Sequence, residues 1–155
     1  KQMNKIYVLV PIYNFSQFLE ACLKSILLQS YRDWYCVLFD DGSTDNSIKI
    51  CKNYTSRHPN KFKYVKLSNK NNGPAYSKFY GIQAVKELCD KDDIFMIVDG
   101  DDFLVTPFAF SIISKKYQDT KCLATFGSYQ GKFSEYQKNI QTNIYSRKTW
   151  FYSPP

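Results

Sequence analysis

The sequence predicts an α/β fold, a mostly parallel sheet with helices on both faces, and three observations support this. Apolar runs rich in β-branched and aromatic residues alternate with segments of helical periodicity. Two of these runs end directly in acidic loops, at residues 40–45 and 99–102. The chain has 155 residues, of which 44% are hydrophobic, enough for one compact domain with a buried core.

The expected strands are the short apolar runs at residues 6–10, 34–39, 62–67 and 94–98. A further strand is expected at 122–126, and the pattern then decays, so residues 130–155 receive no assignment. The expected helices lie at residues 19–27, around 48–54, at 75–88 and at 107–117. Alternation of this kind is typical of a parallel sheet that is covered on both faces.

Polar residues before the first two helices are the candidate N-caps. They are Asn14 or Ser16 for the first helix and Ser43 or Thr44 for the second, because their side-chain oxygens can accept from free backbone N–H groups. Asp45 would then lie in the first turn of the second helix, where the helix dipole favours a carboxylate.

The chain is basic, with 21 Lys and Arg against 14 Asp and Glu and a net charge of +7. The acidic residues gather in tight loops while the lysines are scattered, and there is no arginine-rich run or nucleic-acid motif. This distribution argues against a nucleic-acid binder. It favours a basic surface around an acidic pocket, with a positive field that attracts an anionic ligand such as a nucleotide diphosphate.

The cysteines are odd in number, form no CxxC pair and mostly occupy apolar positions of expected strands and helices: Cys22, Cys36, Cys51, Cys89 and Cys122. Buried, reduced thiols are the simplest interpretation. They favour a reducing compartment, and so a cytoplasmic location. No signal peptide or membrane-spanning run is visible in the sequence.

The loop at 99–102 carries three carboxylates, Asp99, Asp101 and Asp102, within four residues. At a separation of about 4 Å and an effective dielectric constant of about 20, each charged pair costs about 4 kcal/mol. Solvent or a hard divalent cation can relieve this repulsion. Because ligands bind beyond the carboxyl ends of parallel strands, the acidic loops at 40–45 and 99–102 are expected to meet in one crevice.

Three motifs in this order, at residues 8–14, 40–47 and 99–102, resemble the nucleotide-sugar-binding half of a family 2 glycosyltransferase. The resemblance spans residues 5–129. It implies a GT-A fold, which is Rossmann-like, and the domain is expected to be incomplete. Residues 1–129 would form the nucleotide-sugar-binding portion, and 130–155 the start of an acceptor-side region or an irregular tail.

The resemblance implies roles for the residues that end the first two strands. Pro11 and Tyr13 would line the base pocket. Asp41 would accept a hydrogen bond from N3–H of uracil, and Asp40 would support either the loop or the base. The alternative for both aspartates is a solvated turn that caps a helix, since Asp-Asp-Gly-Ser forms good turns in any context.

The acidic loop after the fourth strand matches the family's DxD-type motif. Asp99 would contact ribose or sugar hydroxyls, and Gly100 would let the backbone approach the ligand closely. Asp101 and Asp102 are the metal candidates, with at least one of them binding Mn²⁺ or Mg²⁺. A water-exposed acidic loop is the alternative, which the apolar strand before it disfavours.

Residues 72–82 resemble the family's helix after the third strand, and Asn72, Gly73 and Lys78 are expected to bind the donor. The sequence departs from the family pattern here. Lys78 stands where arginine is common, and Phe79 where asparagine is common. Lysine meets a phosphate as a point charge without the bidentate fork of arginine. A solvated helix lysine is the competing interpretation of Lys78.

The resemblance implies metal-dependent, inverting transfer of a sugar from a UDP-sugar to a hydroxyl of a glycan, protein or lipid. The general base is unknown: Asp119 and Glu135 are the only carboxylates after Asp102, and neither is assigned. The chain is therefore expected to be cut from a longer enzyme. The alternative is a non-catalytic nucleotide-sugar-binding or interaction module. A nucleotidyltransferase or a dinucleotide-binding oxidoreductase is disfavoured because their glycine-rich signatures are missing.

Overall fold

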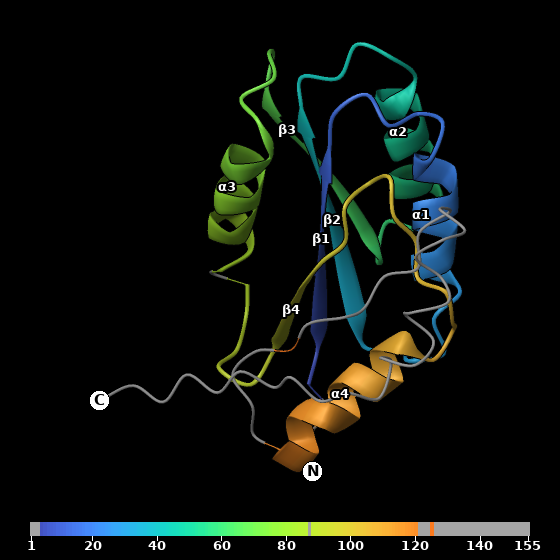
Figure 1. Ribbon diagram of the computed structural model, residues 1–155, viewed down its shortest axis with the longest axis vertical. Coiled ribbons are helices and arrows are strands. Elements are labelled where there is room, and N and C mark those ends of the chain that lie inside the picture. The colour runs from blue at the N-terminus through green and yellow to red at the C-terminus, as the bar shows by residue number, and fades with distance from the viewer. Residues whose placement is uncertain (1–3, 87, 121–124, 126–155) are drawn as a thin grey trace, which may run out of the picture. The chain divides into compact units, whose positions relative to one another are not determined.

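The computed structural model describes residues 4–86, 88–120 and 125, and strands and helices alternate along them (Figure 1). The strands are β1 (Ile6–Ile12), β2 (Trp34–Asp41), β3 (Phe62–Ser68) and β4 (Ile94–Ile97). The helices are α1 (Leu19–Leu27), α2 (Ser47–Arg57), α3 (Pro74–Lys86) and α4 (Ala109–Thr120). The strand predicted at 122–126 falls almost wholly outside the described residues, as do residues 130–155.

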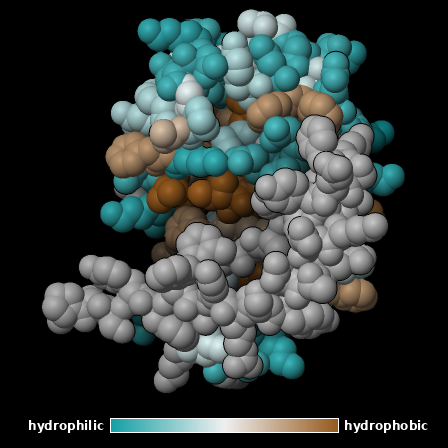
Figure 2. Space-filling view, in the orientation of Figure 1, coloured by the Kyte–Doolittle hydropathy of each residue, from teal (hydrophilic) through white to brown (hydrophobic). Residues whose placement is uncertain are grey.

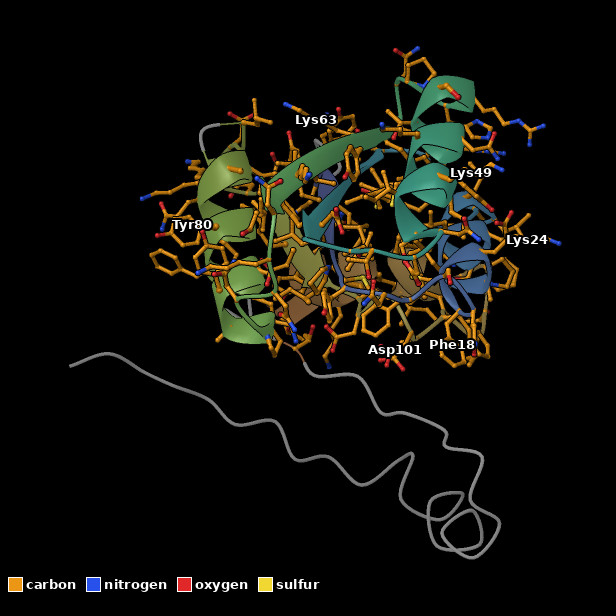
Figure 3. All side chains as sticks on the ribbon, turned by 90° about the horizontal axis from the view of Figure 1, so that it is seen from above. Phe18, Lys24, Lys49, Lys63, Tyr80 and Asp101 are labelled. Atoms are coloured by element: carbon orange, nitrogen blue, oxygen red, sulfur yellow. The ribbon has the colours of Figure 1, made fainter. Side chains whose placement is uncertain are left out.

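The four strands form one parallel sheet in the order β3-β2-β1-β4. All seven residues of β1 are buried, as expected of a central parallel strand covered on both faces. Helix α3 covers one face, and α1 and α2 cover the other, as Figures 1 and 3 both show. The predicted fold class is therefore confirmed over the described residues.

The sheet packs against α3 through a small apolar cluster of Leu9, Val37, Phe39 and Val85. Aromatic rings close the amino end of the sheet, where Trp34 packs edge-on against Phe62 at 5.5 Å between ring centroids. A side chain of this size contributes about 1.5–3 kcal/mol when fully buried, so these contacts fix the strand positions from which the loops depart.

Pro11 lies near the end of the central strand β1, although proline cannot donate to a sheet ladder. It is tolerated because the pairing of β1 with β4 covers only Ile6 to Leu9, whereas the pairing with β2 runs on to Ile12. The last residues of β1 therefore have a strand neighbour on one side only. The other side is left to the loop that follows β4.

Helix α4 begins at Ala109, two residues later than predicted. The segment before it is held by Gln29, which follows α1, instead of starting a helix. Gln29 donates to the carbonyl of Thr106 and accepts from the N–H of Phe110, at 2.8 and 3.1 Å. The hydroxyl of Thr106 accepts from the N–H of Phe108, which delays the first helical turn.

Cys22, Cys36 and Cys51 are free and buried, as predicted, while Cys89 is partly exposed and Cys122 lies outside the described residues. Burial raises the pKa of the Cys22 and Cys51 thiols to about 12, so both stay protonated and unreactive near neutral pH. In the part of the chain that the structure describes, no helix combines the length and apolar character needed to cross a bilayer.

Candidate functional site

All four strands are parallel, so their carboxyl ends point toward the same edge of the sheet, upward in Figure 1. The acidic loops at 40–45 and 99–102 follow β2 and β4, which pair with β1 from opposite sides. Both loops therefore leave the same edge of the sheet, and the crevice expected between them stays a prediction. Figure 2 shows hydrophilic residues across the upper part of the molecule, where this edge lies.

Asn14 joins the loop after β1 to the loop after β2. Its N–H donates to the Ser43 hydroxyl at 3.0 Å, and its Oδ1 accepts from the N–H groups of Thr44 and Asp45 at 2.8 and 3.3 Å. Its φ of +55° lies in the left-handed region, which asparagine tolerates better than most residues. Asn14 was predicted as a possible cap of α1, and that is wrong: the N-cap is Phe18, with no side-chain cap bond.

The predicted caps of α2 are also wrong, because Ser43 and Thr44 bond to Asn14 and the N-cap is Asn46. Asp45 lies just before the helix and not in its first turn. It accepts from the N–H groups of Ser47 and Ser16 at 2.9 and 3.0 Å. Burial alone would raise the pKa of Asp45, but these hydrogen bonds outweigh it and lower the pKa to about 2.

Asp45→Asn is expected to lower the free energy of unfolding by about 1 kcal/mol at pH 7, because the charge that strengthens both hydrogen bonds is lost. The folded pKa of Asp45 lies below the unfolded value of about 3.9. The stabilisation is therefore fully present above pH 4 or so and disappears as the pH falls towards the folded value. Urea unfolding of both proteins between pH 7 and 2.5 measures this. A difference independent of pH would contradict it.

Asp40 is fully buried, and both of its oxygens are used within the fold. One accepts from the N–H of Ser43 and the other from the Tyr64 hydroxyl, each at 3.0 Å. Burial and this hydrogen bond raise the pKa of Tyr64, which therefore remains a donor. These contacts hold the loop after β2, which is one of the two roles predicted for Asp40.

Asp41 is 1% exposed, and its carboxylate binds the loop that precedes α3. Oδ2 accepts from the N–H groups of Asn72 and Gly73 at 2.7 and 3.0 Å, and Oδ1 accepts from the Asn72 side-chain amide at 2.9 Å. Because α3 starts at the next residue, the carboxylate lies at the positive end of its dipole. Sequence analysis predicted all three residues as separate ligand contacts and missed that they bond to one another.

Gly42 places the same two loops in backbone contact. Its φ is +84°, and a Cβ added to it would lie 2.6 Å from the backbone nitrogen of Lys70. No side chain can occupy that position without moving the loop after β3. The loops after β1, β2 and β3 are therefore joined in series by backbone and side-chain contacts.

In the loop after β4, Asp99 forms an ion pair with Lys78 of α3 at 2.9 Å. The two side chains are 43% and 35% exposed, and exposed pairs of this kind contribute only about 0–1 kcal/mol. A Cβ on Gly100 would lie 2.8 Å from the Phe15 ring and 3.2 Å from the Pro11 carbonyl. The Gly100 backbone thus lies close to the end of β1 and the loop after it, whereas the approach predicted from the sequence was to a ligand and stays a prediction.

Asp101 and Asp102 are both exposed, and Figure 3 shows the Asp101 side chain at the margin of the molecule, pointing away from the sheet. Burial, followed by the charges of Asp101 and Asp99, raises the pKa of Asp102, and Lys78 offsets part of this. Among residues 4–86, 88–120 and 125, no three His, Cys, Asp or Glu side chains converge as a ready metal cluster. The loop nevertheless holds more negative charge than Lys78 balances, and its oxygen donors suit a hard cation.

Pro11 is buried, while Tyr13 is 37% exposed in the loop after β1. A separate groove of about 490 Å³ lies between α1 and residues 104–107, and none of the predicted site residues lines it. The geometry therefore keeps the candidate site at the carboxyl edge of the sheet.

A family model described as glycosyl transferase family 2 matches residues 7–154. The chain belongs to glycosyltransferase family 2. It is 34% identical over 124 residues to glycosyltransferase GlyG of Streptococcus pneumoniae serotype 4, covering 80% of this chain and 38% of GlyG. It is 28% identical over 118 residues to the teichoic acid poly(glycerol phosphate) polymerase of Staphylococcus epidermidis, covering 76% of this chain and 15% of the polymerase. The chain thus spans well under half the length of these relatives.

Solved structures similar to this family 2 chain share its fold. One is mannosyltransferase PcManGT from Pyrobaculum calidifontis in complex with GDP-Man and Mn²⁺, with a TM-score of 0.68, 21% identity and coverage of 79% of this chain and 34% of that one. Another is S. aureus TarS 1–349 in complex with UDP-GlcNAc, with a TM-score of 0.66, 20% identity and coverage of 84% and 38%. The fold predicted by resemblance, GT-A, is confirmed.

Proposed function

We propose that this family 2 chain is the donor-binding part of a glycosyltransferase. It binds a UDP-sugar at the carboxyl edge of the sheet and supports inverting, metal-dependent transfer of the sugar to a hydroxyl of a glycan, protein or lipid. The observation that carries the proposal is the placement of both acidic loops at one sheet edge, on either side of β1. Similarity to a TarS structure that contains UDP-GlcNAc supports the choice of nucleotide.

Asp41 is the residue proposed to read the base. A carboxylate accepts hydrogen bonds and donates none, which suits the N3–H group of uracil. Its Oδ1 accepts a single hydrogen bond, from Asn72, and keeps a lone pair for the base. Pro11 and Tyr13 lie at the end of β1 and in the loop after it, where they would flank the ring.

Asp99 and Lys78 are proposed to bind the sugar hydroxyls and the diphosphate of the donor. Asp99 would accept from ribose or sugar hydroxyls. Lys78 would turn from its weak, exposed pair with Asp99 toward the diphosphate as a point charge. The small free energy of that pair means that little is lost when the two side chains separate.

Asp101 and Asp102 are proposed to hold the divalent cation, Mn²⁺ or Mg²⁺. Their oxygens and the surplus negative charge of the loop fit a hard cation that takes its remaining ligands from a diphosphate. The cation, when bound, neutralises charge on the departing diphosphate. The chain's own part is to hold this loop in place, which the contacts of Gly100 with Phe15 and Pro11 do.

The general base that takes the proton of the acceptor hydroxyl is proposed to come from outside the described residues. Asp119 is exposed in α4, with no observation that connects it to the donor edge. A nucleotide-sugar-binding module without catalysis is the alternative. Manganese-dependent UDP binding with no sugar release, across many acceptors, would favour the module over the enzyme.

Asp41→Ala tests the proposed function. We expect its affinity for UDP to fall about 10- to 100-fold, the loss typical of a hydrogen bond to a charged group, while Mn²⁺ binding in the absence of nucleotide stays unchanged. Isothermal calorimetry measures both. Asp41→Asn keeps an acceptor for the loop before α3, so it distinguishes a lost base contact from a folding defect. Asp92→Ala, at the amino end of β4, is the matched control. Unchanged UDP affinity in both Asp41 variants would refute the assignment.

A further inference from the structure

We infer that Asn72 is a positioning residue that sets base specificity by orienting Asp41, an inference that rests on the proposed function. Asn72 would act on the base through another side chain and need not touch the donor itself. The inference follows from how the two oxygens of Asp41 are occupied, and from how the Asn72 amide is held.

The two carboxylate oxygens of Asp41 have different surroundings. Oδ2 accepts two backbone hydrogen bonds, from Asn72 and Gly73, and its capacity is filled. Oδ1 accepts one, from the Asn72 side-chain amide at 2.9 Å. Oδ1 is therefore the oxygen with a lone pair that the fold leaves unused, and the hydrogen bond from Asn72 helps to fix the carboxylate plane in which that lone pair lies.

The Asn72 amide is itself fixed at both of its hydrogens. One bonds to Asp41 Oδ1 and the other to the carbonyl of Lys70, each at 2.9 Å. Lys70 is the residue whose backbone lies against Gly42. The amide is thus anchored to the same turn that carries Asp41, and it cannot rotate without breaking a hydrogen bond.

This arrangement favours bases that present a donor. Three donors surround the Asp41 carboxylate and hold Oδ1 in one direction. Uracil presents N3–H to such an oxygen, whereas cytosine presents an unprotonated N3, which an anionic oxygen repels. If the Asn72 side chain is lost, Oδ1 loses its one hydrogen bond while Oδ2 keeps both backbone bonds, so the carboxylate is held less firmly and the preference for uracil over cytosine should shrink.

The test compares Asn72→Ala, Asn72→Asp and the control Asn69→Ala in the full chain. Asn69 is an exposed asparagine of the same loop for which the structure gives no hydrogen bond. We expect Asn72→Ala to weaken UDP about five- to tenfold and to leave CDP affinity nearly unchanged. Both Asn72 variants lose the bond to Lys70, but Asn72→Asp also repels Asp41, so it should weaken UDP about 30-fold or more.

Calorimetric titration with UDP and CDP, with thermal unfolding run alongside, distinguishes the outcomes. An equal loss of UDP and CDP affinity, or an equal effect of Asn72→Ala and Asn72→Asp, would assign Asn72 a structural role only and overturn the inference. If Asp41→Ala weakens UDP while the Asn72 variants behave like Asn69→Ala, the proposed function stands and the inference fails. If the unsubstituted chain binds no UDP, both fail.

Discussion

Removal of the carboxylate that we propose to hold the cation, at position 101 or 102, is expected to lower sugar transfer by the enzyme about 100- to 1,000-fold, the typical loss when one electrostatic stabiliser of a developing charge is removed. Asp101→Ala and Asp102→Ala, made separately, show which residue holds the cation. The variant that loses the cation-binding carboxylate should need a higher Mn²⁺ concentration for half-maximal UDP release. The change is local, because both side chains are exposed and pack in no core.

Asp92→Ala is the matched control, since Asp92 is an exposed aspartate before the amino end of β4, the same strand whose other end carries the acidic loop. It should leave turnover and metal requirement unchanged. If neither Asp101→Ala nor Asp102→Ala alters the Mn²⁺ dependence of UDP release, the loop does not hold the cation. Unaltered thermal unfolding of the variants ensures that lost activity is not lost structure.

Gly42→Ala is expected to lower the free energy of unfolding by about 2–5 kcal/mol. About 1–2 kcal/mol comes from a left-handed φ in a non-glycine residue, and about 1–3 kcal/mol from forcing atoms into an occupied space. The added Cβ would lie 2.6 Å from the Lys70 nitrogen, and because the obstacle is backbone it cannot rotate away. Denaturant unfolding at constant pH measures the loss.

Gly73→Ala separates the conformational cost of a left-handed φ from the steric cost of the close contact. Gly73 also has a left-handed φ, +95°, but nothing lies within 4 Å of an added Cβ. It should therefore cost only the conformational part, about 1–2 kcal/mol. Equal destabilisation by both substitutions would show that the contact between Gly42 and Lys70 is not tight in solution.

The strands and helices could be predicted from the sequence because their signals are local. The apolar run that forms β1 has all its residues buried, and the apolar positions of α1 at 19, 22, 23 and 26 are the buried ones. The end of β2 could not be predicted in this way. It continues through Asp40 and Asp41, which pair with Lys66 and Ser68 of β3, so polar residues extend a strand whose apolar run has stopped.

The edge of the sheet at which the acidic loops lie could be predicted from the sequence, but the bonding among their residues could not. The motif spacing placed the acidic loops at one edge, because parallel strands end on the same side. The partners of Asn14, Asp41 and Lys78 lie 21 to 32 residues away in sequence. Local propensity therefore predicted Asn14 as a helix cap. In the structure its side-chain oxygen accepts instead from backbone N–H groups of another loop.

The serial bonding of three loops has a consequence for the entropy of ligand binding. Asn14, Asp41 and Gly42 connect the turns after β1, β2 and β3, and the described side chains contain no buried polar atom without a partner. The nucleotide that we propose to bind at this edge would contact turns that are already ordered by folding. Exposed or partly exposed side chains such as Tyr13, Lys78 and Asp101 still lose freedom on binding, but the backbone of the first three turns does not, so more of the contact free energy is left for affinity.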